Sequence, residues 1–288
     1  MTQKIISIVN RHRGVGKTTL AIGIADTFVS EHKAHVCLVD LDPQSSASQA
    51  LLPAAEFEER VRNDRNLHGL LLARLSGEDP ELTEHRRDRL RFIKARDEVD
   101  VRLYPNSHRL WDLQERELRL DGGTRLSNAI KRVLRQEAED GRVVIVDCPP
   151  GQSVGALAAI QGSDLVLCPI TPDRLAIWGK DLLTEYLKDY APKTRRRFVI
   201  TRARSSWGER EARSALQRLS QDPEMLQAVS AERTRGAPGI TRLSEQHRVK
   251  RRLGLTCVKP LRKIYGGLGS RELTTIVNAL QRELEAYG

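Results

Sequence analysis

A short glycine-containing segment near the N-terminus carries residues suited to binding phosphate groups. It reads Arg13-Gly14-Val15-Gly16-Lys17-Thr18-Thr19 and lies between a predicted strand at residues 4–9 and a predicted helix at residues 18–32. Glycines let backbone amides approach phosphate oxygens, and a helix N-terminus adds partial positive charge. We expect Lys17 to reach the β- and γ-phosphates of a nucleotide and the Thr18 hydroxyl to bind Mg²⁺. The first glycine of the general pattern G-x-x-x-x-G-K-S/T is replaced by Arg11.

Two aspartate motifs follow later predicted strands. VDLDPQ contains Asp40 and Asp42, and VIVDCPPG contains Asp147. A carboxylate at the C-terminal end of a parallel strand faces the ligand crevice of such a sheet. We expect Asp147 to hold Mg²⁺ or its water ligands, and Asp42 to orient an attacking water and to be a further candidate metal ligand. Either aspartate alone could cap a helix, whereas the three motifs in this order favour a nucleotide site.

The elements that must position these residues are short apolar runs separated by helical patterns. The predicted strands are residues 4–9, 35–39, 101–104, 142–146, 165–168 and 197–201. Continuous Val/Ile runs indicate strands that are buried on both faces, so the predicted fold is α/β, a mostly parallel sheet with helices on both faces. Apolar stripes at residues 126–134 and 273–284 predict two of the helices, the second with Ser270 as its cap.

The length of 288 residues fits one domain spanning residues 1–288, with residues 53–96 as a helical and loop excursion over the sheet edge. No apolar run approaches the length of a transmembrane helix, and the first residues lack the features of a signal peptide. The four cysteines are widely spaced, without a C-x-x-C pair, which disfavours a zinc site or a dithiol redox motif. We therefore expect a cytoplasmic protein with reduced cysteines.

The basic charge of the chain is regional. Overall, 48 Lys and Arg face 38 Asp and Glu, for a net charge of +10, but residues 192–271 alone carry a net charge of +14. Arginine forks grip phosphate oxygens well, so this region is predicted to bind DNA, although it could also be a solvated surface. Aromatic residues make up 4% of the chain, which favours phosphate contact on a duplex over base stacking. The candidate contacts are Arg202, Arg204, Arg248, Lys250, Arg251, Arg252, Lys259, Arg262 and Lys263, with residues 195–197 as further candidates.

Together these motifs resemble the ParA/MinD family of deviant Walker ATPases over nearly the whole chain. The resemblance lies in GVGKTT at 14–19, DLDPQ at 40–44 and IVDCPPG at 145–151, with a weaker block, YPNS, at 104–107. The ParA branch is the better match, because the chain ends LQRELEAYG rather than in the basic amphipathic membrane helix of MinD-type proteins.

The resemblance implies that ATP and Mg²⁺ close a sandwich homodimer that binds double-stranded DNA without sequence preference. It also implies a ParB-like or other activating adaptor protein, and a role in positioning a plasmid, a chromosome or another cargo. The protein would associate with the nucleoid and not with a membrane. Lys17 and Thr18 would then serve the phosphates and Mg²⁺, Asp42 the attacking water, and Asp147 the metal.

One departure from the family pattern K-G-G-x-G-K-T concerns its first lysine, which reaches across the dimer. His12 stands at that position and Arg13 replaces the next glycine. Histidine is shorter than lysine and neutral over much of the physiological range, so we expect Arg11 or Arg13 to supply the cross-dimer cation. Two other readings remain: a nucleotide-gated DNA-binding protein with little hydrolysis, and a small-molecule or redox enzyme of the same fold. A redox enzyme like the nitrogenase iron protein needs two suitable cysteines, and only Cys148 lies near the site.

Overall fold

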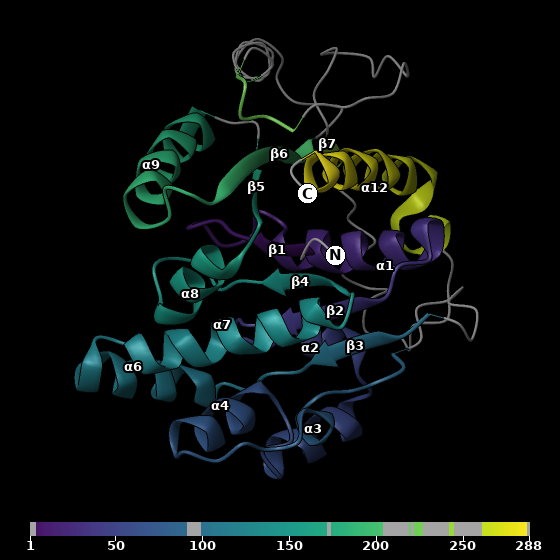
Figure 1. Cartoon of the computed structure of the whole chain (residues 1–288). Helices are drawn as coiled ribbons and strands as arrows, with labels where there is room; N and C mark the ends of the chain where they lie inside the picture. Colours follow the sequence, from purple (N-terminus) through teal and green to yellow (C-terminus); the bar gives the residue numbers. More distant parts are fainter. Residues whose placement is uncertain are drawn as a thin grey trace.

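Seven strands form one sheet in the order β3-β2-β4-β1-β5-β6-β7, and every neighbouring pair is parallel. The computed structural model describes residues 4–90, 99–171, 174–203, 219, 222–226, 242–244 and 261–286. The first strand lies near the middle of the sheet, between β4 and β5 (Figure 1). The α/β fold predicted from the apolar runs is therefore confirmed.

The elements have the following bounds. The strands are β1 (Lys4–Ile8), β2 (Val36–Asp40), β3 (Val101–Tyr104), β4 (Val143–Asp147), β5 (Leu165–Ile170), β6 (Arg195–Ala203) and β7 (Arg242–Ser244). The helices are α1 (Lys17–His32), α2 (Ser46–Leu51), α3 (Ala54–Arg62), α4 (Leu67–Leu75), α5 (Leu82–His85), α6 (Arg109–Asp121), α7 (Thr124–Glu139), α8 (Val154–Gly162), α9 (Arg174–Tyr190) and α12 (Leu261–Glu285).

Helices cover both faces of the sheet, as Figure 1 shows. One apolar cluster joins the sheet to α1 and α12, and a second joins the opposite face to α4, α6, α7, α8 and α9. Neighbouring residues of one strand belong to different clusters: Ile5 lies in the second and Ile6 in the first. This alternation explains why the strands read as continuous apolar runs, because each face of the pleat is buried.

The six predicted strands are present, and β7 is an addition that its short sequence did not indicate. The predicted cap at Ser270 is wrong, because α12 begins at Leu261 and passes through that position. The apolar stripe that begins at Leu273 packs α12 against α1. The helix extends before this stripe although Gly266, Gly267 and Gly269 in that part are weak helix formers.

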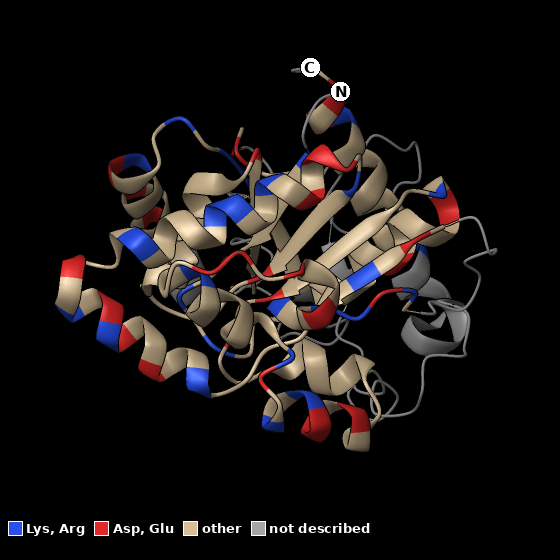
Figure 2. Ribbon diagram, turned by 60° about the horizontal axis from the view of Figure 1, so that its bottom comes forward, with Lys and Arg blue, Asp and Glu red and all other residues tan. Residues whose placement is uncertain are grey.

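A buried charge network ties the chain before β3 to the sheet edge. Glu137 of α7 is fully buried and accepts hydrogen bonds from Arg86 (2.7 Å), Arg102 (2.8 Å) and the Tyr104 hydroxyl (2.6 Å). Arg87 also forms an antiparallel bridge with Leu103 on β3. These bonds hold residues 86–88 against the edge strand. Figure 2 shows basic and acidic residues interspersed along the described helices.

Within the part of the chain that the structure describes, no helix has the length and apolar character needed to cross a bilayer. Cys37, Cys148 and Cys168 are free thiols buried inside the protein. The fourth cysteine, Cys257, lies outside the described residues.

Candidate nucleotide-binding site

The loop between β1 and α1 has the backbone geometry that phosphate binding requires. Gly14 and Gly16 have φ angles of 76° and 95°, in the left-handed region that glycine adopts without strain. Gly16 occupies the N-cap position of α1 and contributes no side chain to the first-turn amides. No acidic residue lies in that turn, so the helix N-terminus presents its amides and partial positive charge to an anion.

Lys17, the first residue of α1, is folded back over this loop. Its Nζ donates a 3.0 Å hydrogen bond to the backbone oxygen of His12, and the residue is only 7% exposed. Burial lowers the pKa of Lys17, while the carboxylates of Asp147 and Asp42 raise it. The structure therefore brings the lysine and the two predicted aspartates close enough to act on one another.

Asp147 and Asp40 are register partners at the C-terminal ends of β4 and β2, and both are fully buried. Their surroundings differ. Asp40 accepts hydrogen bonds from the amide (2.8 Å) and hydroxyl (2.6 Å) of Ser48 and from the amide of Asp42 (3.3 Å). Burial raises the pKa of Asp40 to about 7, and the Ser48 bonds oppose that rise.

Neither carboxylate oxygen of Asp147 has a hydrogen-bond partner of normal geometry. Burial and the neighbouring Asp40 raise the pKa of Asp147 well above its ordinary value, while the Thr18 hydroxyl and Lys17 lower it. Buried polar atoms without partners are uncommon in folded proteins and call for an explanation. A cation facing Asp147 would supply the missing partner, next to the Thr18 hydroxyl that acts on this carboxylate from the phosphate-binding loop.

Asp42 lies in the loop after β2 and is half-buried. Its carboxylate accepts a hydrogen bond from the Gln44 amide (2.9 Å), and its backbone oxygen accepts one from the Asn106 side chain (3.4 Å). Burial raises the pKa of Asp42, and Lys17 and Arg13 lower it. The carboxylate thus stays within reach of both the loop cations and solvent, as a group that orients water requires.

Polar residues that the sequence did not single out as site residues hold this loop in place. The Asn10 side chain donates to the Pro169 oxygen (2.7 Å) and accepts from the His12 amide (2.8 Å). The Thr201 hydroxyl, buried at the end of β6, donates to the Val15 oxygen (2.6 Å). The sequence predicted that Thr201 ends a strand. Only its hydrogen bond to Val15 shows that it anchors the phosphate-binding loop.

The cations around the missing signature lysine have different neighbours. The His12 ring lies against α9, since a Cβ atom on Gly179 would be 3.2 Å from its Nε2. Arg11 acts electrostatically on Tyr186 of α9, whereas Arg13 acts on Lys17 and Asp42. Both arginines are exposed. Arg13 is therefore the flanking cation directed towards the phosphate site of its own chain.

The residues present fit a nucleotide with Mg²⁺: a glycine cradle, a lysine, a hydroxyl and an unpartnered buried carboxylate. When bound, Mg²⁺ neutralises phosphate charge and orders the phosphate oxygens. The loop amides and Lys17 would hold the β- and γ-phosphates, and Thr18 and Asp147 would face the metal. The described residues contain no cluster of three or more His, Cys, Asp or Glu suited to a metal held by protein alone.

The predicted DNA contacts fall mainly outside the described residues. For Arg202, Arg262 and Lys263 the structure describes the backbone but not the side chains. The remaining candidates lie outside the described residues: Arg204, Arg248, Lys250, Arg251, Arg252 and Lys259. Two of the further candidates are engaged within the protein. Arg196 pairs with Glu224 (2.6 Å) and Arg197 with Glu283 (2.8 Å), which leaves them poor phosphate ligands.

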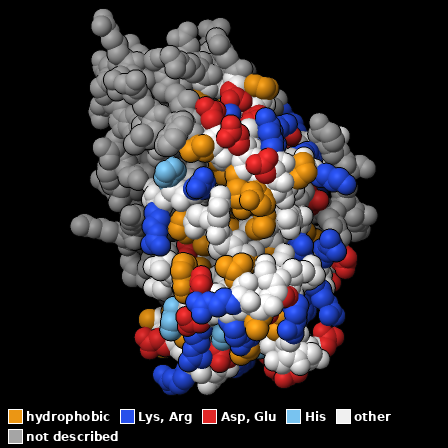
Figure 3. Space-filling view, turned by 90° about the vertical axis from the view of Figure 1, so that its left-hand side faces the viewer, with side chains coloured by type: hydrophobic (Ala, Val, Ile, Leu, Met, Phe, Trp, Pro, Cys, Tyr) orange, Lys and Arg blue, Asp and Glu red, His pale blue; other side chains and the backbone are white. Residues whose placement is uncertain are grey.

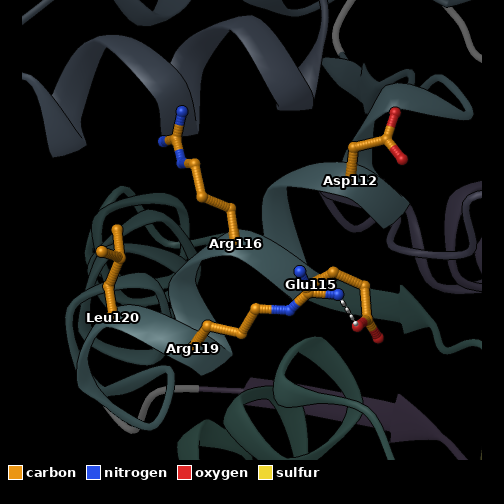
Figure 4. A pocket seen from close by; sticks show the side chains of 5 residues that line it. All are labelled: Asp112, Glu115, Arg116, Arg119 and Leu120. Atoms are coloured by element: carbon orange, nitrogen blue, oxygen red, sulfur yellow. Dashed lines mark ion pairs between the residues drawn. The ribbon is translucent and has the colours of Figure 1, made fainter.

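Figure 3 shows the side of the molecule on which the β1–α1 loop lies, with hydrophobic side chains among charged ones. A surface groove lies apart from that loop, on α6. It is lined by Asp112, Glu115, Arg116, Arg119 and Leu120 (Figure 4). None of these is a predicted site residue, so the candidate site is the loop and not this groove.

Comparison with known proteins agrees with the geometry. The profile of a family described as an AAA domain matches residues 3–200. The chain belongs to the ParA/Soj-type ATPase family. The chromosome-partitioning ATPase Soj of Thermus thermophilus is 30% identical to this ParA-type chain over 174 residues, or 60% of this chain and 57% of that one. The chain spans less than two thirds of the length of the first curated relatives it matches.

Solved structures share the fold. A plasmid partition protein of Borrelia burgdorferi bound to AMPPNP has a TM-score of 0.70 and 19% identity, covering 98% of this chain and 99% of that one. Cobyrinic acid a,c-diamide synthase of Mycobacterium smegmatis, bound to ADP and magnesium, has a TM-score of 0.65 and 22% identity, covering 99% and 96%. At these identities the likeness shows the fold alone.

Proposed function

We propose that this ParA-type protein is an ATP-dependent switch that dimerises, binds double-stranded DNA without sequence preference, and positions a plasmid, a chromosome or another cargo. The observation that carries the proposal is the convergence of Lys17, Thr18, Asp42 and Asp147 on the glycine loop. The Asp147 carboxylate has no hydrogen-bond partner of normal geometry there. The family membership supports ATP as the nucleotide. The cargo would be linked through a ParB-like or other adaptor that stimulates hydrolysis, and the active dimer would associate with the nucleoid.

In this proposal each site residue has one task. The loop from Arg13 to Thr19 wraps the phosphates, with Lys17 on the β- and γ-oxygens. Thr18 and Asp147 hold the metal or its waters, and Asp42 orients the attacking water. Arg13 supports the partner's nucleotide in place of the lysine absent at His12, because it is exposed beside the phosphate-binding loop whereas Arg11 lies near Tyr186 of α9.

The basic region at residues 192–271 is the proposed DNA surface, since the remainder of the chain has a net charge of −4. Phosphate contacts release counterions, so affinity should fall steeply as salt rises. Each lost phosphate contact should lower the slope of log affinity against log salt by about 0.9.

The decisive experiment measures binding to a random DNA duplex with and without ATP. The parent protein should bind tightly only with ATP. Lys17→Ala should lose the ATP effect, and the double variant Arg251→Ala/Arg252→Ala should lose DNA affinity while keeping ATP binding. A matched control, Arg62→Ala/Arg135→Ala, removes two exposed arginines elsewhere and should bind as the parent does. DNA binding that ignores ATP, or an affinity insensitive to salt, would refute the proposal.

The arginine assignment has its own test, nucleotide-dependent dimerisation measured by light scattering. Arg13→Ala should dimerise poorly with ATP, whereas Arg11→Ala should dimerise as the parent does. If both variants dimerise like the parent, neither arginine replaces the missing lysine. His12 favours a second candidate function, a nucleotide-gated DNA-binding protein with little hydrolysis, which would show ATP-dependent DNA binding but negligible turnover even with its adaptor.

A third candidate is a small-molecule enzyme of the same fold, which the diamide synthase shares. Such an enzyme would bind ATP but show no ATP-dependent affinity for DNA. Its redox variant is not favoured, because Cys148 is fully buried and does not reach a surface where two chains could share a cluster.

A further inference from the structure

Gln114 of α6 makes a buried hydrogen bond to the helix that follows the Asp147 motif. Its Oε1 accepts from the backbone amide of Gly155 at 2.9 Å, and Gln114 is only 6% exposed. A Cβ atom on Gly155 would lie 3.1 Å from that oxygen and 3.4 Å from the Leu41 side chain. The glycine therefore lets α8 approach both α6 and the loop that contains Asp42.

The bond satisfies one of the free amides at the start of α8. Ser153 caps this helix by accepting from the Ala156 amide (3.1 Å), and Gln114 supplies the acceptor for Gly155 in the same turn. First-turn amides have no partner within their own helix, so a buried one needs an acceptor from elsewhere. In this protein α6 provides it.

The segment from Asp147 to Gly155 is thus held at both ends. At its start, the Cys148 amide donates to the Ile8 oxygen (3.3 Å), and the Asp147 oxygen accepts from Leu41 (2.9 Å). At its end, Gly155 is held by Gln114. Between them, Gly151 turns the chain with a φ of 86°. The six residues between these two anchors, 149–154, can therefore move only as far as the anchors allow.

Gln114 lies on the buried face of α6. Leu110, Leu113 and Glu117 share its buried face, whereas the groove residues lie on the exposed face. Figure 4 shows Arg119 reaching towards Glu115 on that exposed face, with Arg116 pointing away from this pair. Gln114 is consequently a link inside the protein and not a surface group.

We propose that Gln114 is a positioning residue for the nucleotide site: by holding Gly155 it fixes the segment after Asp147 in the arrangement that binds Mg²⁺–nucleotide. This inference rests on the proposed function, since it assumes that Asp147 faces the metal. Gln114 touches neither nucleotide nor metal and acts through α8. A displacement of about 1 Å in such a supporting group can lower a rate by about 100-fold.

The test compares Gln114→Leu with Gln114→Glu. Leucine is similar in size but cannot accept the Gly155 hydrogen bond, whereas a Glu carboxylate can, and its negative charge suits a helix N-terminus. Asn66→Ala is the matched control, because Asn66 caps α4 in the same manner, accepting from the Gly69 amide at 3.1 Å, far along the chain from the site. All variants are first compared by thermal unfolding.

The readout is binding of a fluorescent ATP analogue, titrated with Mg²⁺ and in EDTA. In EDTA, Gln114→Leu should bind the analogue within about twofold of the parent. The Mg²⁺ concentration at half-maximal binding should rise about tenfold in Gln114→Leu and about twofold or less in Gln114→Glu and Asn66→Ala. The expected rise of about tenfold reflects the loss of one buried hydrogen-bond acceptor and the displacement of the segment after Asp147 that this acceptor holds in place.

An unchanged Mg²⁺ midpoint in Gln114→Leu would overturn the inference. So would an equal rise in Asn66→Ala, which would reveal a general loss of stability, or an equal rise in Gln114→Glu, which would show that the acceptor is irrelevant. If the parent protein fails to bind the analogue at all, the proposed nucleotide site itself is wrong and this inference falls with it. Binding by the parent with no effect of Gln114→Leu would reject the positioning role alone.

Discussion

Asp147→Asn is expected to stabilise the nucleotide-free protein while it weakens the response to Mg²⁺–ATP. In the folded chain the Asp147 carboxylate is fully buried, has no hydrogen-bond partner of normal geometry, and lies beside the carboxylate of Asp40. Asparagine keeps the shape of the side chain and removes its charge. The substitution therefore separates the energetic effect of the charge from that of packing.

The expected size of the effect follows from the burial. Asparagine keeps the cost of a buried polar group and removes only the cost of the buried charge, which amounts to several kcal/mol in proteins. Part of this penalty is offset by the attraction of Lys17. We therefore expect the free energy of unfolding of Asp147→Asn to exceed that of the parent by about 1–3 kcal/mol at pH 8.

The sign of the pH dependence is also determined. Because the folded-state pKa of Asp147 is raised, the folded protein holds the proton more tightly than the unfolded chain does. The stability of the parent therefore falls as pH rises from the unfolded pKa through the folded one. The difference between variant and parent should be small near pH 4 and should reach its full size above the folded pKa.

The assay is urea unfolding at several pH values, with and without Mg²⁺–ATP. A ligand at 100 times its dissociation constant stabilises the state it binds by about 2.7 kcal/mol. The parent should show this gain and Asp147→Asn should lose most of it. The control is Asp40→Ala, which removes the equally buried register partner of Asp147. This variant should be less stable than the parent, because the Ser48 amide and hydroxyl lose their acceptor. A destabilised Asp147→Asn without ligand, or one with a full Mg²⁺–ATP gain, would refute the reasoning.

Three further perturbations have defined outcomes. Thr201→Val removes the hydroxyl that donates to Val15, and should lower the free energy of unfolding by about 1–2 kcal/mol in urea titrations and weaken nucleotide binding; unchanged values for both would contradict its anchoring role. Burial raises the pKa of Asp26 to about 7, so its carboxylate lowers the stability of the parent as pH rises from 4 to 7. Asp26→Asn should lose less stability than the parent over this range and should be more stable by roughly 2–4 kcal/mol at pH 8; parallel pH profiles would contradict this. Gly69→Ala places a Cβ atom 1.9 Å from the backbone oxygen of Asp64, and should destabilise the fold by more than about 3 kcal/mol in thermal unfolding; a melting temperature equal to that of the parent would show that the backbone yields.

Much of the fold could be predicted from local patterns, because a strand buried on both faces leaves a continuous apolar run. Strand β7 was missed because three residues, Arg242–Ser244, carry too little pattern to be recognised. The start of α12 was misplaced for a related reason. The apolar stripe marks only the part of a helix that packs on the core, and helices can extend beyond it.

The residues of the candidate site could be selected from the sequence, since Lys17, Thr18, Asp42 and Asp147 each follow a strand or open a helix. Parallel strands bring those positions to one edge of the sheet. The sequence motifs pointed to Asp42 for the attacking water and indicated no role for Asp40, two residues earlier. The structure shows that Asp40 is a buried anchor bonded to Ser48, while Asp42 is half-buried in the loop.

The sequence by itself therefore determined the fold class, the phosphate loop and the acidic strand ends, because these depend on short-range spacing. Only the tertiary structure decided which polar side chains hold the phosphate loop and the acidic strand ends in place. Asn10, Thr201 and Gln114 meet their partners across 159, 186 and 41 positions of the chain. No local pattern records such pairs, since they arise from how the helices and strands pack. The same packing left the Asp147 carboxylate without a hydrogen-bond partner of normal geometry, and its proposed role in binding a metal rests on that observation.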